Sequence, residues 1–352
     1  MQPDRRSCAN LERVRHRFDR PSCDVPPSAR SHPLHPLHNF AKSTVANVAS
    51  GMVPVTAALR AHFAMLCFSA LIAGSFSLGG MAANFISPLA LNGIRFIFAA
   101  AIVGGASMVM GQMSLRHFQA PWRHTVLGAM MACYFVLMFE GLKTSAPVST
   151  SAVFTLTPIM AGIAGYLLLN QAMSRRVLLA LAVGGAGALW VIFRADWLAL
   201  LQFQIGLGER IFFWGCLAHA VYTPMVRRLH RGEPVLVFTF GVLAAGAVLL
   251  CWIGWSDLLA TDWANLPMIV WITLVYVAIM ATSVTFVLMQ YASLRLPPAK
   301  VMAYTYLTPS WVLVWEIVLG HAVPPAPILI GVALSVIALV ILLKEDPKLQ
   351  PM

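Results

Sequence analysis

Residues 141–169 read GLKTSAPVSTSAVFTLTPIMAGIAGYLLL, and residues 292–320 read ASLRLPPAKVMAYTYLTPSWVLVWEIVLG. Both segments are apolar and helix-length, and both contain Leu-Thr-Pro near the middle, about 150 residues apart. Pro158 and Pro309 each remove a backbone hydrogen bond and bend a helix. Membrane helices tolerate such a break where neighbouring helices satisfy the freed carbonyl. The duplicated segment predicts a two-fold transporter in which the broken helices mark the substrate path.

The composition is that of a membrane protein. Hydrophobic residues make up 59% of the 352 residues, and charged residues make up 11%. A water-soluble domain of this length cannot bury so much apolar surface. A helix needs roughly 20 apolar residues to cross a bilayer, and ten runs approach that length: 61–80, 88–109, 124–142, 147–169, 175–193, 208–226, 234–253, 267–291, 299–320 and 324–343. We therefore expect an all-α membrane protein with ten transmembrane helices.

The two halves of the chain correspond beyond the proline helices. Pro88 opens the second run and Pro234 opens the seventh, each at a helix-starting position. Residues 61–194 and 206–344 each hold five runs, and because five is odd, the second half enters the membrane in the opposite orientation. Two inverted five-helix repeats predict a secondary transporter, with one site near the midplane exposed to alternate sides.

The distribution of charge predicts the orientation. With the N-terminus in the cytoplasm, the outer positions hold Lys143, Arg194 and Arg210, together with Asp257 and Asp262. The inner positions hold far more basic residues: Arg60, Arg116, Arg123, Arg175, Arg176, Arg227, Arg228, Arg231, Arg295, Lys300, Lys344 and Lys348. This asymmetry follows the positive-inside rule and places both termini in the cytoplasm. The bases are spread over separate short loops, so no nucleic-acid partner is expected.

The first 55 residues differ from the rest, and two interpretations stay open for them. They form either a disordered extension or a segment before the true start at Met52. His32, His35 and His38 are evenly spaced, but no scaffold holds them, so no metal site is expected. The six cysteines (Cys8, Cys23, Cys67, Cys133, Cys216 and Cys251) lack paired spacing and are interpreted as packing residues. No cofactor is expected, and residues 345–352 are expected to form a cytoplasmic tail.

Several short motifs, in a fixed order, resemble a known family. They are Ala73-Gly74-Ser75-Phe76, Ile86-Ser87-Pro88 and Arg95-Phe96, then Gly141-Leu142-Lys143-Thr144 through Leu156-Thr157-Pro158 to Asn170-Gln171. The second half matches again with Ala220-Val221-Tyr222, Arg227-Arg228, Leu307-Thr308-Pro309 and Leu319-Gly320-His321. Residues 61–343 thus resemble an EamA-domain transporter of the bacterial drug/metabolite transporter superfamily.

The resemblance implies ten helices in the bacterial inner membrane and export or exchange of small metabolites, often amino acids or related compounds. The chain departs from the family pattern at three places. The family usually shows a Gly-Glu pair after each proline helix, where this chain has Asn170-Gln171 and Gly320-His321. The family's tryptophan before the first glycine is Ala73 here. These departures weaken any transfer of substrate specificity.

Charged residues at lipid depth are costly unless they are paired, so they are candidates for the transport pathway. Arg95 lies roughly 10 Å below the outer surface at helical rise, and Glu140 and Glu316 lie near the outer ends of their spans. We expect Arg95 to pair with one of these glutamates and to form an outer gate or an anion-handling site. As alternatives, Glu140 reaches Lys143 at i+3, or either glutamate extends into the headgroups.

His219 lies near the middle of the sixth span. Its ordinary pKa is close to neutral, so it is a candidate proton acceptor, and protons are a candidate coupling ion. A neutral imidazole hydrogen-bonded inside the bundle is the alternative.

The ninth span carries an aromatic stripe of Tyr304, Thr308, Trp311 and Trp315 at helical spacing. This stripe faces either a cavity for flat or cationic substrates or the lipid. Small residues at four-step spacing, among them Gly128 with Ala132 and Gly331 with Ser335, predict close helix packing. The same interpretation applies to Gly184 in the cluster Gly184-Gly185-Ala186-Gly187.

The sequence distinguishes three functional classes. A membrane-embedded enzyme would need a catalytic motif, but the sequence holds neither HExxH nor GxSxG, so no enzyme activity is expected. A passive channel or scaffold does not explain why five spans are duplicated. No nucleotide-binding loop is present, which argues against ATP-driven transport by this chain alone. A secondary transporter of small molecules is preferred, and a homodimer is left open.

Overall fold

The computed structural model describes residues 55–171, 174–193, 195–201, 205–321 and 325–344. These residues form helices, turns and loops, with no strand among them. The expectations for the N-terminal extension with its three histidines, for Met52, for Arg194 and for the C-terminal tail lie outside this part of the chain.

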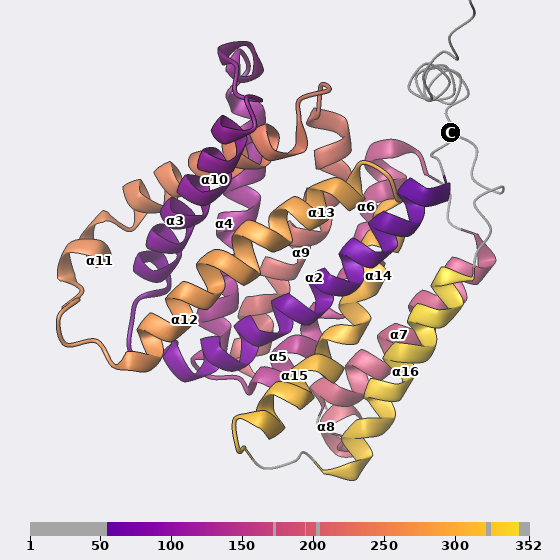
Figure 1. The fold of residues 1–352 in the computed structure, drawn as a ribbon. Helices are drawn as coiled ribbons and strands as arrows, with labels where there is room; N and C mark the ends of the chain where they lie inside the picture. Colours follow the sequence, from indigo (N-terminus) through magenta and orange to yellow (C-terminus); the bar gives the residue numbers. More distant parts are fainter. Residues whose placement is uncertain (1–54, 172–173, 194, 202–204, 322–324, 345–352) are drawn as a thin grey trace, which may run out of the picture. The chain divides into compact units, whose positions relative to one another are not determined.

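The first half contains five long helical segments, the fourth of them interrupted (Figure 1). Their bounds are α2 Val55–Ala82, α3 Pro88–Val109, α4 Trp122–Leu142, α5 Pro147–Phe154 with α6 Thr157–Leu169, and α7 Arg175–Ile192. A short 3-10 helix, η1 Leu115–Phe118, lies between α3 and α4, and α8 Trp197–Leu201 follows α7.

The second half repeats this order of segments. It contains α9 Leu207–Leu229, α10 Val235–Ile253, the short α11 Trp255–Ala260, α12 Met268–Ala278, a π-helical turn η2 Ile279–Val284, α13 Thr285–Ser293, α14 Pro298–Ala303, a 3-10 turn η3 Tyr304–Leu307, α15 Thr308–Val318 and α16 Ala326–Leu343.

Eight of the described helical segments are long and apolar enough to cross a membrane. They are Thr56–Ala82, Pro88–Val109, Trp122–Leu142, Pro147–Leu169, Arg175–Ile192, Val235–Ile253, Met268–Ser293 and Ala326–Leu343. The other two runs expected from the sequence are also helical. One is α9, which carries Glu209 in its first turn and two arginines in its last. The other is residues 298–318, which the 3-10 turn divides.

The two Leu-Thr-Pro motifs lie where helices restart. The α-helix stops at Phe154, and α6 begins at Thr157 with Pro158 in its first turn. In the second half, the 3-10 turn ends at Leu307, and α15 begins at Thr308 with Pro309 in its first turn. A proline needs no hydrogen-bond acceptor at this position, because first-turn amides have no partner within the helix.

The helices pack in pairs that join the two halves. In Figure 1, α3 lies beside α10 and α7 lies beside α16. α4 packs on α9, and the counterparts of these helices, α13 and α2, also pack on each other. The broken segments cross one another, with α5 against α15 and α6 against α14. Most helix contacts therefore have a counterpart with the halves exchanged.

Glycines allow α4 to approach α10 closely, and α7 to approach α16. A Cβ added at Gly128 of α4 would lie 2.7 Å from the backbone nitrogen of Gly246 in α10. A Cβ added at Gly331 of α16 would lie 2.7 Å from the carbonyl oxygen of Gly187 in α7. The packing role predicted for Gly128 and Gly331 is confirmed.

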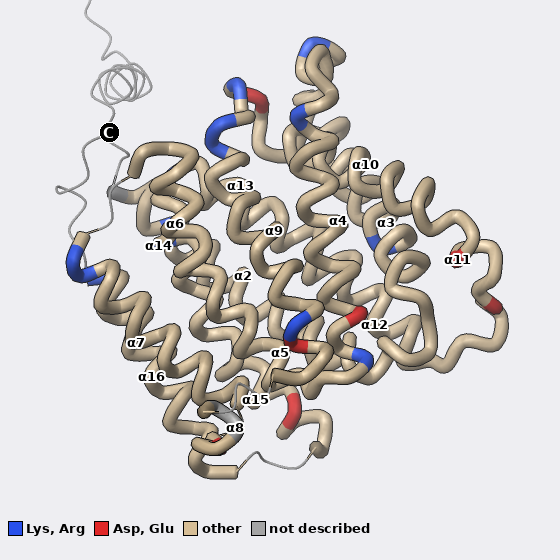
Figure 2. The backbone as a smooth tube through the Cα atoms, turned by 180° about the vertical axis from the view of Figure 1, so that it is seen from behind, with Lys and Arg blue, Asp and Glu red and all other residues tan. Residues whose placement is uncertain are grey.

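The outward faces of the helices are apolar, as lipid-facing surfaces require. Trp252 of α10 is 78% exposed, and Leu167 of α6 is 70% exposed. Figure 2 shows basic residues dominating one end of the helices, whereas acidic and basic residues are mixed at the other end.

Candidate functional site

Arg95 is the most deeply buried cation among the described residues, with no exposed surface. Its Nη2 donates to the carbonyl oxygen of Ala281 at 2.9 Å, and its Nε donates to the Thr282 hydroxyl. Its Nη1 donates to Oδ1 of Asn92 at 3.3 Å. The guanidinium carbon also lies 3.6 Å from the centre of the Phe135 ring. α3 is thereby tied to α4 and to the π-helical turn in the second half.

Two of the acceptors of Arg95, Ala281 and Thr282, lie in the π-helical turn. A π turn widens the helix by one residue and disturbs the regular hydrogen-bond ladder, and such turns often occur at functional sites. Here Thr282 donates its hydroxyl to the carbonyl of Val277 at 2.6 Å, and Ser283 donates to Ala278 at 2.7 Å. This turn was not predicted from the sequence. Two adjacent hydroxyl residues inside an otherwise apolar span were the available signal.

The expected pairing of Arg95 with Glu140 or Glu316 is wrong. Glu140 Oε2 instead accepts from Lys143 Nζ at 2.8 Å, which is the local i+3 alternative. Glu316 Oε2 lies 2.8 Å from Nδ1 of His321. Both glutamates lie near the ends of their helices and find partners there, whereas Arg95 faces the π turn from the second turn of α3. Within the described residues, Arg95 makes no ion pair with a carboxylate.

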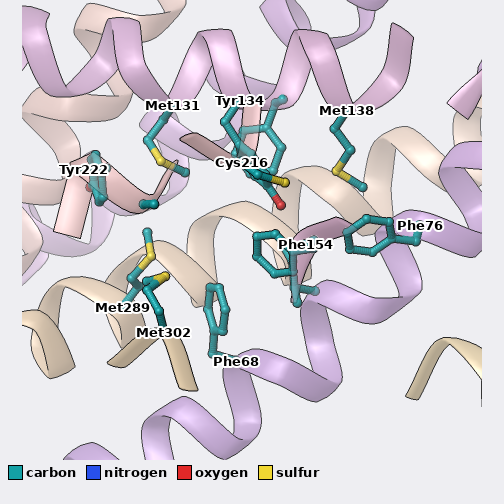
Figure 3. Packing of buried hydrophobic residues seen from close by; sticks show 14 of the residues in the cluster. Phe68, Phe76, Met131, Tyr134, Met138, Phe154, Cys216, Tyr222, Met289 and Met302 are labelled. Carbon is teal, nitrogen blue, oxygen red and sulfur yellow. The ribbon is translucent and has the colours of Figure 1, made fainter. Parts of the chain in front are cut away.

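His219 lies in a group of aromatic rings, defined here as the central aromatic cluster: Phe68, Tyr134, Phe154, Phe212 and His219. The His219 ring lies 4.5 Å from the Tyr134 ring, 5.1 Å from Phe154 and 6.5 Å from Phe68. Figure 3 shows Phe68, Tyr134 and Phe154 turned toward one another, with Cys216 beside Tyr134. The cluster joins α2, α4 and α5 of the first half to α9 of the second.

Two polar atoms in the central aromatic cluster have no hydrogen-bond partner among the described residues. They are the Tyr134 hydroxyl and Nδ1 of His219. Tyr134 has no exposed surface, and His219 is 1% exposed. A buried polar atom without a partner costs about 1–3 kcal/mol. A ligand that forms a hydrogen bond with either atom would therefore recover part of that free energy. At Nδ1, the hydrogen bond expected for a satisfied core histidine is missing.

The predicted aromatic stripe is divided between two environments. Tyr304 and Thr308 are buried, and the Tyr304 hydroxyl lies 3.0 Å from Nδ1 of His62. Trp311 is 36% exposed, and Trp315 is half-buried against Tyr276. The 3-10 turn has three residues per turn, so it breaks the helical register assumed from the spacing.

The crossing of the broken helices is held by a polar contact between the halves. The Thr157 and Thr305 hydroxyls lie 3.0 Å apart, and the carbonyl oxygens of Phe154 and Met302 lie 2.7 Å from them respectively. Because each hydroxyl has one proton, one threonine donates to the other and the second donates to the carbonyl in its own segment. Nearby, a Cβ added at Gly184 of α7 would lie 2.3 Å from Cζ of Tyr306. The glycine cluster around Gly184 therefore serves packing, as predicted.

A buried ion pair, not predicted from the sequence, joins α4 to the loop between α9 and α10. Arg123 Nη2, at the start of α4, lies 2.7 Å from Glu233 Oε1, in the loop between α9 and α10, and the two side chains are only 4% and 5% exposed. Arg123 Nη1 donates to the carbonyl of Leu229 at 2.7 Å, and the Arg231 amide donates to Glu233 at 2.7 Å. Burial alone would raise the pKa of Glu233, but the hydrogen bonds from Arg123 and Arg231 outweigh it and lower that pKa.

A second buried acid joins the halves near the start of α9. Glu209 Oε1 accepts a hydrogen bond from the Ser149 hydroxyl of α5 at 2.7 Å. Glu209 is 3% exposed. The burial of Glu209 was not predictable from the sequence, because hydropathy does not show which charge near a helix end a neighbouring helix covers.

Apolar spans, lipid-facing outer surfaces and reciprocal packing of two halves define a multi-pass membrane protein built from two repeats. The chain belongs to the EamA-like transporter family, which matches residues 59–193 and again residues 206–344. The resemblance inferred from the motifs is thus confirmed.

The chain is also similar to a curated transporter and to a solved structure. The chain is 25% identical over 224 residues to "Uncharacterized transporter YyaM" of Bacillus subtilis (strain 168), a match that covers 62% of this chain and 73% of the relative. A solved crystal structure shares the fold with a TM-score of 0.64 and 20% identity, covering 84% of this chain and 98% of the other.

Proposed function

We propose that this protein is a secondary transporter of the bacterial inner membrane that exports or exchanges small metabolites, such as amino acids or related compounds, by alternating access. The observation that carries the proposal is the reciprocal packing of the two repeats around a core with buried polar groups. Rocking one half against the other around such a core exposes a single site to each side in turn.

The proposal includes ten crossings in two inverted repeats. Eight segments qualify by length and composition, and α9 and residues 298–318 supply the remaining two crossings. With five crossings in each half, the second repeat enters the membrane upside down. The concentration of basic residues at one helix end favours both termini on the cytoplasmic side (Figure 2).

Topology is tested by labelling single cysteines from outside intact cells, in a background without the six native cysteines. Arg116, Arg231 and Asp262 are exposed and suit the purpose. We expect an impermeant maleimide to label the cysteine at Asp262→Cys, and to label those at Arg116→Cys and Arg231→Cys only after permeabilisation. Labelling of the cysteines at positions 116 and 231 from opposite sides would contradict the inverted arrangement.

Transport is tested by metabolite profiling. Cells that express the protein and cells that carry an empty vector are washed, and the compounds they release are identified by mass spectrometry over time. We expect a defined set of small metabolites to accumulate faster outside the expressing cells. Purified protein in proteoliposomes should then move the same compounds. Indistinguishable release from the two cell lines, with the protein present in the membrane, would refute export.

A further inference from the structure

Arg95 and the central aromatic cluster together suggest what the transporter carries. We infer that its substrates are small carboxylates with an apolar or flat remainder, held by Arg95 and by hydrogen bonds from Tyr134 and His219. This inference rests on the proposed transport function and adds the chemical class of the substrate.

Arg95 carries a buried positive charge that has no carboxylate partner among the described residues. A buried charge without a partner is strongly unfavourable, by several kcal/mol in proteins. The Phe135 ring and three oxygen acceptors offset part of that cost for Arg95. A guanidinium has five N–H donors, and the hydrogen bonds to Asn92, Ala281 and Thr282 use three of them. Two donors and one positive charge remain for an anion.

The buried cation is linked through ring contacts to Tyr134 and His219, which carry the unpartnered polar atoms. The Arg95 guanidinium lies on the Phe135 ring, and the Phe135 ring lies 4.6 Å from the Tyr134 ring. The Tyr134 ring in turn lies 4.5 Å from His219. These contacts join the Arg95 guanidinium, the Tyr134 ring and the His219 imidazole into one continuous group of buried side chains.

The charge and the donor geometry of Arg95 suit a carboxylate. One guanidinium balances one negative charge, and its planar donors suit the two oxygens of a carboxylate. A phosphate dianion would bring a second negative charge to a site with one buried cation. The rings of Phe68, Phe154 and Phe212 offer apolar faces to the rest of the molecule.

Two variants separate substrate binding from structural support. Arg95→Gln removes the charge, whereas Arg95→Lys keeps it and loses the planar fork. Arg95 also holds the π turn, so Arg95→Gln could disturb folding. Tyr134→Phe avoids this difficulty, because its hydroxyl has no partner among the described residues and its loss should leave the melting temperature unchanged or higher.

The experiment profiles metabolites released by cells expressing wild-type protein, Arg95→Gln, Arg95→Lys, Tyr134→Phe or the surface control Lys143→Gln, each at matched membrane levels. We expect every compound whose release depends on the wild-type protein to carry a carboxylate. Arg95→Gln should lower that release at least about tenfold, Arg95→Lys should lower it less, and Lys143→Gln should leave it unchanged. In proteoliposomes, Tyr134→Phe should raise KM about tenfold with an unchanged melting temperature.

Three outcomes would overturn the inference. One is release of compounds without a carboxylate. Another is normal release by a folded Arg95→Gln variant, and the third is an unchanged KM for Tyr134→Phe. Each of these leaves the transport function standing. If the wild-type protein releases nothing above the empty vector, the proposed function fails, and the inference about its substrates falls with it.

Discussion

The ion pair between Arg123 and Glu233 yields a quantitative prediction about stability. Replacing Arg123 with Met leaves a carboxylate that is only 5% exposed without its cation. Loss of one partner from a buried pair costs about 3–5 kcal/mol. We expect about 3 kcal/mol, because Glu233 lies in a loop between helices and keeps the hydrogen bond from the Arg231 amide. In detergent, this corresponds to a fall in melting temperature of about 5 °C.

A matched control and a double variant test the physical reasoning. The partly exposed pair between Lys143 and Glu140 should contribute about 0–1 kcal/mol, so Lys143→Met should shift the melting temperature by about 1 °C or less. Combining Arg123→Met with Glu233→Leu should restore part of the loss, since no unpaired charge remains. The recovery stays incomplete because the Leu229 carbonyl loses its donor. Equal falls in melting temperature for Arg123→Met and Lys143→Met would contradict this reasoning. So would a double variant whose loss of stability equals the sum of the losses in Arg123→Met and Glu233→Leu.

Three further predictions concern stability in detergent. Because the folded pKa of Glu233 lies below its ordinary value of 4.5, its stabilisation is complete above about pH 4.5 and is lost as pH falls through the folded value; acidification should therefore lower the melting temperature of wild type more than that of Glu233→Gln. Gly128→Ala forces a Cβ against the backbone of α10 and should cost about 1–3 kcal/mol, whereas Gly105→Ala, with open space around it, should be neutral or slightly stabilising in the same thermal assay. Ser149→Ala removes the hydroxyl donor of buried Glu209 and should lower the unfolding free energy by about 1–3 kcal/mol; an unchanged melting temperature would show that Glu209 has another source of compensation.

Long-range features of the fold were accessible from sequence where they repeat or follow a strong period. The two Leu-Thr-Pro motifs predicted a duplicated, interrupted helix because proline has a fixed effect on backbone geometry. The pair formed by Glu140 and Lys143 was accessible for a similar reason, since i+3 neighbours meet on any helix. The depth of Arg95 was also predictable from its distance along the helix, and Arg95 is indeed buried in the second turn of α3.

The partners of Arg95 were not accessible. Its acceptors Ala281 and Thr282 lie 186 and 187 residues away in the chain, within a π turn that hydropathy does not show. The central aromatic cluster was missed for a related reason. Helices that are hydrophobic on every side carry no period that separates a core-facing Phe154 from a lipid-facing Leu167.

The π turn has a further consequence for the helix that follows it. An ordinary α-helix advances by about 100° per residue, so rewinding Ile279–Val284 as regular α-helix, with no residue removed, would rotate all of α13 by roughly that angle. Gln290, whose amide now donates to the Tyr222 hydroxyl at 2.9 Å, would swing away from α9, and Phe286 would leave the Phe135 ring that it stacks against. The extra residue of the π turn thus determines which side of α13 contacts the first repeat.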